Sequence, residues 1–126
     1  MNARLALVFG TLFGGLSVAL GAFAAHGLKK TLSVYHLDIF QTGVHYQAIH
    51  ALALIAVALW MRQIGDAPRA LKLAAAFFTA GVLFFSGSLY VLALTGITLF
   101  GAVTPVGGIC FLIGWAAALT AAWRSE

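Results

Sequence analysis

The sequence predicts an all-α integral membrane protein: a bundle of four transmembrane helices with both termini in the cytoplasm. Of its 126 residues, 63% are hydrophobic and only 8% are charged, and the mean hydropathy is +1.04. Soluble domains carry about 25% charged residues, so this chain has too few polar side chains to cover a surface in water. Lipid is therefore its expected solvent, and residues 1–126 are expected to form a single transmembrane domain.

Four apolar runs account for nearly the whole chain. They cover residues 5–25, 39–61, 73–95 and 104–123. Runs of about 20 residues cross the hydrocarbon core at about 1.5 Å per residue. The break between the second and third runs contains Gly65 and Pro68, which favour a turn. Thr104 and Pro105 are typical of a helix start, although a fourth helix continuous from Ile97 and kinked at Pro105 is the alternative.

Two further features concern how the helices begin and which faces they bury. Ser33 is a suitable N-cap, so the second helix is expected to start at Val34, before it enters the membrane.

Small residues recur on the first span at Gly10, Gly14, Ser17, Gly21 and Ala25. Such a stripe lets another helix approach closely. One arc of the second helix is purely apolar and is expected to face lipid: Leu37, Phe40, Val44, Ala48, Ala51 and Ile55.

The basic residues lie at the ends of the apolar runs and are distributed unequally between the two ends of the bundle. The terminal end would hold Arg4, Arg62, Arg69, Lys72 and Arg124. The opposite end would hold only Lys29 and Lys30. The positive-inside rule then predicts a multi-pass membrane protein with both termini in the cytoplasm, or in its equivalent in an organelle. These residues form no basic face, so nucleic-acid binding is excluded from the expected partners.

The second span carries polar side chains at membrane depth, where they are costly and often functional. Gln47 and His50 are expected near the middle of the bilayer, and Ser86 on the third span at a similar depth. We expect these three side chains to meet between the second and third helices. Tyr46 and Tyr90 would then lie above them, towards the outer face.

This polar cluster has three interpretations. The side chains can simply hydrogen-bond and clamp the helices together. They can form a binding or proton-linked transport site, in which His50 handles protons near neutral pH. Catalysis is disfavoured because no pair of carboxylates lies in the spans. We therefore expect no enzyme, although an activity on a lipid or quinone with an added acid or metal remains an alternative.

No metal or other cofactor is expected. His45 and His50 are five residues apart, so they point in different directions and cannot chelate one ion as an i,i+4 pair would. A bis-histidine haem would need a second histidine at mid-depth on another span, and none is present. His26 ends the first helix, where it can cap the helix or contact the top of the second; it is kept as a further candidate binding residue.

Four segments carry a resemblance to a known family: GAFAAHGL at 21–28, FQTGVHYQAIHALAL at 40–54, FSGSLYVLALTG at 85–96 and TPVGGICFLIGW at 104–115. Together they resemble the small bacterial inner-membrane proteins of the YgdD/YwdK type, a family of unknown function with mitochondrial relatives in animals. The resemblance implies a four-span, multi-pass protein of the plasma (inner) membrane with an unassigned activity. Residues that match the family motifs are His26, Tyr46, Gln47, His50, Ser86, Ser88 and Tyr90.

Besides the enzymatic alternative, two functions are left open by the sequence. The first is a structural or accessory component of the membrane that acts by helix packing. Its partners would be the lipid bilayer and either a larger membrane complex or further copies of the chain. The second is a binding or transport protein for a small molecule at Tyr46, Gln47, His50, Ser86 and Tyr90.

Overall fold

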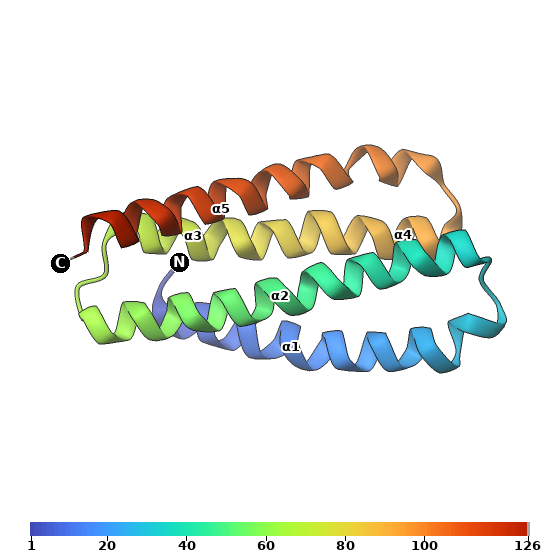
Figure 1. The fold of residues 1–126 in the computed structure, drawn as a ribbon, viewed down its shortest axis with the longest axis horizontal. Coiled ribbons are helices and arrows are strands. Elements are labelled where there is room, and N and C mark those ends of the chain that lie inside the picture. The colour runs from blue at the N-terminus through green and yellow to red at the C-terminus, as the bar shows by residue number, and fades with distance from the viewer. Residues whose placement is uncertain (126) are drawn as a thin grey trace.

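The computed structural model describes residues 1–125, all arranged as helices and short connections; Glu126 lies outside them. The main helices are α1 (Ala3–His26), α2 (Val34–Ile64), α3 (Arg69–Gly81), α4 (Gly87–Thr95) and α5 (Thr104–Arg124). Three shorter segments are η1 (Leu28–Lys30), η2 (Val82–Ser86) and η3 (Thr98–Ala102). Figure 1 shows that α3, η2 and α4 follow one another as a single rod.

Four long helices therefore form the bundle, and each is long and apolar enough to cross a membrane. Both termini and the α2–α3 turn lie at one end, which we call the terminal end (Figure 1). The α1–α2 connection and η3 lie at the other. The predicted all-α four-span fold is confirmed, with one notable boundary change: the third helix starts at Arg69, four residues earlier than expected.

Local signals set the helix ends as expected. The Ser33 hydroxyl accepts a hydrogen bond from the His36 amide at 3.1 Å and caps α2. Gly65 and Gly96 take positive φ angles of 83° and 71° directly after helices, a conformation that L side chains resist. Pro105 lies in the first turn of α5, which begins at Thr104 and not at Ile97.

The small-residue stripe of α1 packs directly against α2. A Cβ placed on Gly10 would lie 2.8 Å from Ile55 Cγ1 and 3.1 Å from the Ala51 carbonyl oxygen. Phe40 and Ala51 are buried, and Val44 lies beside Gly21. The expectation that this apolar arc of α2 faces lipid is therefore wrong. A side chain that faces lipid and one that faces an apolar helix are equally apolar, so hydropathy could not show whether this arc faces lipid or α1.

A π-helical segment, η2, interrupts the third span and was not predicted. It packs against α5 with very close contact: a Cβ on Gly107 would overlap the backbone of Phe85. Farther along the same interface, Gly81 lies under the ring of Phe111. Gly107 thus lets α5 reach the backbone of η2, and Gly81 lets the Phe111 ring of α5 pack against α3. Such close approach increases van der Waals contact, which matters because no hydrophobic effect operates between helices in lipid.

Replacement of Gly107 by Ala should destabilise the bundle by about 1–3 kcal/mol, because the new methyl group must push η2 and α5 apart. The neighbouring Gly108→Ala variant is the matched control. A Cβ there would meet the Phe85 ring at an ordinary 3.9 Å, so it should be neutral or slightly stabilising. Thermal unfolding in detergent checks both variants. Equal stability of the two would contradict the observed contact.

Candidate functional site

The predicted polar cluster is buried, but its members do not form one site. Gln47, His50 and Ser86 have exposed fractions of 3%, 4% and 0%. Each forms its hydrogen bonds with a different part of the bundle. The expectation that these three side chains meet one another is therefore wrong, and each of them contacts a different neighbour.

Gln47 joins three helices. Its side-chain Nε2 donates to the Phe13 carbonyl of α1 at 2.9 Å, and its Oε1 accepts from the Tyr90 hydroxyl of α4 at 2.6 Å. A carbonyl can only accept, so the Phe13 contact fixes which way the amide is turned. Both ends of the Gln47 amide are thus used inside the protein.

Ser86 ties the π-helical segment to α2. Its hydroxyl donates to the Gly43 carbonyl at 2.7 Å. The absence of a side chain at Gly43 makes room for the Tyr90 ring, since a Cβ there would lie 2.8 Å from Tyr90 Cε1. A second hydroxyl contact, between Ser88 and Thr104 at 2.6 Å, links α4 to the start of α5.

His50 is turned towards α5. Its Nδ1 lies 2.8 Å from the Tyr46 carbonyl oxygen, and its Nε2 accepts from the Trp115 indole N–H at 3.0 Å. A carbonyl needs a donor and an indole N–H needs an acceptor, so these partners select the neutral ring with its proton on Nδ1. The ring also stacks on Phe111, with centroids 3.6 Å apart. Both ring nitrogens are therefore occupied.

The remaining candidates lie farther out. Tyr46 is 40% exposed, and its ring contacts Phe85 and stacks near His50. His26 is exposed at the end of α1 and takes no part in the polar contacts described above. Of the six candidate residues, Gln47 and Tyr90 thus bond to each other and the rings of Tyr46 and His50 stack, whereas Ser86 bonds to the Gly43 carbonyl and His26 lies apart.

Sequence reasoning missed Trp115 and Phe111, the two α5 residues that enclose His50. A signal was present: Trp115 lies in the middle of the last span, where an indole N–H needs an acceptor. The two residues are also four apart, so they share one helix face. The Trp115 side chain is 47% exposed and lies between His50 and the surface of the bundle.

The buried polar atoms are satisfied. Throughout residues 1–125, every buried side-chain nitrogen or oxygen has a hydrogen-bond partner. In that same stretch, no three His, Cys, Asp or Glu side chains gather as a metal site would require. What the arrangement does chemically is to connect helices: α1 to α2, α2 to α4, α2 to α5 and α4 to α5.

The fold and its polar core define a four-span integral membrane protein. The chain belongs to the family described as protein of unknown function (DUF423), whose model matches residues 20–108. It is 42% identical to the UPF0382 inner membrane protein YgdD of Escherichia coli (strain K12), over 98% of this chain and 93% of the relative. It is 39% identical to the UPF0382 membrane protein YwdK of Bacillus subtilis (strain 168), over 92% of this chain and 94% of the relative.

No solved structure matches the chain. The relatives confirm the predicted family resemblance and the location in the inner membrane, and the four helices long enough to cross a membrane support the multi-pass arrangement. They name no activity, substrate or partner.

The contact between Gln47 and Tyr90 should appear as a coupling energy. Gln47→Leu and Tyr90→Phe each leave one polar group without its partner. The loss of unfolding free energy in the double variant should therefore be smaller than the sum of the losses in the two single variants. Interhelical hydrogen bonds in membranes are worth about 0.6 kcal/mol on average and at most about 1.7 kcal/mol, which sets the expected coupling. Thermal or denaturant unfolding in detergent measures it.

His50→Ala and Ser86→Ala supply the control cycle. The bonding partner of Ser86, Gly43, lies seven residues before His50 on α2, a separation of about 10 Å along the helix. The losses of unfolding free energy in the two single variants should add up to the loss in the double variant within about 0.5 kcal/mol. A large coupling in this control, or none between Gln47 and Tyr90, would contradict the contacts described above.

Proposed function

We propose that this protein is a non-enzymatic structural or accessory component of the inner membrane, in which the polar cluster holds the four spans together. The observation that carries the proposal is the complete internal pairing of buried polar atoms in residues 1–125. A polar side chain that is already bonded within the protein must give up that partner before it can bond to a ligand. Here Gln47, His50 and Ser86 are engaged with their own bundle.

The distribution of the contacts supports the same role. Helix association in lipid depends on close packing and on hydrogen bonds between helices. α2 forms such bonds with α1, α4 and α5, and with η2. An accessory role would bring the outer faces of the bundle into contact with a larger membrane complex or with further copies of the chain.

A second candidate function is favoured by one observation. Tyr46 and Trp115 flank His50 and are both partly exposed at the bundle surface. A lipophilic molecule entering between them could replace Trp115 as the partner of His50 Nε2. This would make the protein a small-molecule or proton-linked binding or transport protein.

Native mass spectrometry of the protein purified from its own membrane distinguishes the two functions. The structural role predicts a mass equal to the chain, its copies or partner proteins, and lipids. The alternative predicts one further small molecule per chain that is lost in His50→Phe. Tyr35→Phe is the matched control, because Tyr35 is exposed at the start of α2. A non-lipid molecule present in the wild type and Tyr35→Phe but absent from His50→Phe would overturn the structural role.

We also propose that the terminal end faces the cytoplasm. Arg4, Arg62, Arg69, Lys72 and Arg124 lie near the helix ends at this side of the bundle. Lys29 and Lys30 lie in η1 at the other side. A five-to-two excess of basic residues in short segments is the pattern of the positive-inside rule.

Reporter fusions test this orientation. Green fluorescent protein attached after Ser125 should fluoresce, and alkaline phosphatase at the same position should be inactive, because the first matures in the cytoplasm and the second outside it. Fusions after Thr31, in the α1–α2 connection, are the matched control and should give the reverse pattern. Active phosphatase after Ser125 would show that the orientation is inverted.

A further inference from the structure

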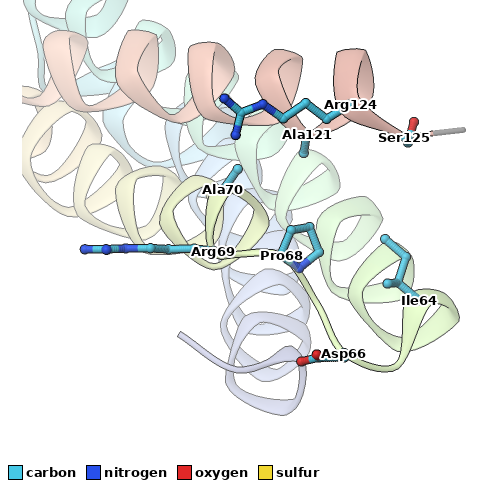
Figure 2. A pocket seen from close by; sticks show the side chains of 8 residues that line it. All are labelled: Ile64, Asp66, Pro68, Arg69, Ala70, Ala121, Arg124 and Ser125. Carbon is cyan, nitrogen blue, oxygen red and sulfur yellow. The ribbon is translucent and has the colours of Figure 1, made fainter.

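A groove at the terminal end remains unexplained by the polar core. It has a volume of about 480 Å³ and lies where the α2–α3 turn meets the last turn of α5 (Figure 2). Ile64, Pro68 and Ala121 give it apolar walls. Arg69 and Arg124 stand on its two sides, one at the first residue of α3 and the other at the last residue of α5.

Among residues 1–125, the charged side chains that line the groove are two guanidinium groups, those of Arg69 and Arg124, and one carboxylate, that of Asp66. In Figure 2, the Arg69 and Arg124 side chains extend in the same direction along the bundle, whereas the Asp66 carboxylate lies on the turn, away from both. Guanidinium groups bind phosphate with paired, charge-assisted hydrogen bonds. Their position at the ends of membrane spans places them at headgroup level.

A second hollow continues from Arg124 along α5. It has a volume of about 320 Å³ and is lined by Leu119, Thr120, Trp123 and Arg124. Leu119 lies five residues before Arg124, which is about 7.5 Å deeper along the helix. One arginine therefore borders both a charged groove and a largely apolar trough that runs towards the membrane interior. A free anion would use only the first, whereas a phospholipid would use both.

We infer that the groove between Arg69 and Arg124 binds the phosphate of an anionic phospholipid, with an acyl chain in the trough along Leu119 and Trp123. The site draws on none of the polar core residues, so it goes beyond the proposed function. Anionic headgroups are recognised elsewhere by basic pockets between transmembrane helices on the cytoplasmic side. The expected occupant is a lipid of the leaflet that surrounds the terminal end.

The test is a lipid titration of the purified full chain in detergent, followed by native mass spectrometry. The probes are dioleoylphosphatidylglycerol, the zwitterionic phosphatidylcholine with the same acyl chains, and inorganic phosphate. The wild type should bind phosphatidylglycerol about tenfold more tightly than phosphatidylcholine. Arg69→Gln with Arg124→Gln should weaken phosphatidylglycerol binding about tenfold, the equivalent of about 1.4 kcal/mol.

Arg62→Gln with Lys72→Gln is the matched control. It removes the same charge from the same end, but from residues that line a different hollow. This variant should lose less than about threefold in affinity. Arg124→Gln alone, at an exposed position, provides a second variant if the double change prevents folding, and should lose about threefold.

Three results would overturn the inference. The first is an equal loss of affinity in the groove and control variants, which would mean that only the general surface charge matters. The second is equal binding of the two phospholipids by the wild type. The third is displacement of phosphatidylglycerol by millimolar inorganic phosphate, which would assign the groove to a free anion.

Discussion

The structure depends on one constraint: a polar group inside the bilayer must find its hydrogen-bond partner within the protein. α2 contributes Gln47 and His50 to the buried polar side chains, and these two bond to groups on three other helices. Gln47 requires a carbonyl from α1 and a hydroxyl from α4. His50 requires a donor and finds the indole of Trp115 on α5. These two side chains therefore link α2 to α1, α4 and α5.

Hydrogen bonds of this length require backbones that lie close together, and the glycines supply that closeness. The Ser86 hydroxyl reaches the Gly43 carbonyl at 2.7 Å, and the Tyr90 ring packs where a Gly43 side chain would be. At the other interface, Gly107 meets the backbone of Phe85 in η2. Close helix packing and interhelical hydrogen bonds thus reinforce each other. Either alone gives little stability, because lipid is as apolar as the helix surfaces.

Much of the fold could be predicted from sequence because span length, caps and turn residues are local signals. Ser33 and Pro105 marked helix starts correctly, and the burial of Gln47 and His50 followed from their position in a span. Their partners could not be predicted. A helical projection gives the direction in which a side chain points, but it does not show which other helix lies on that side. The π-helical segment also changes the register of the third span, and Ser86 pairs one turn nearer the start of α2 than Gln47.

The division of polar groups between interior and ends bears on what such a small protein can do. In the interior, amide, hydroxyl and imidazole groups are paired with one another or with backbone carbonyls. A molecule that approaches His50 must first displace Trp115, and so must break a bond that the bundle already has. At the terminal end, by contrast, arginines border hollows with apolar walls. Under the functions proposed above, other molecules are recognised at the membrane surface, and the bonded interior holds the helices in the arrangement that forms this surface.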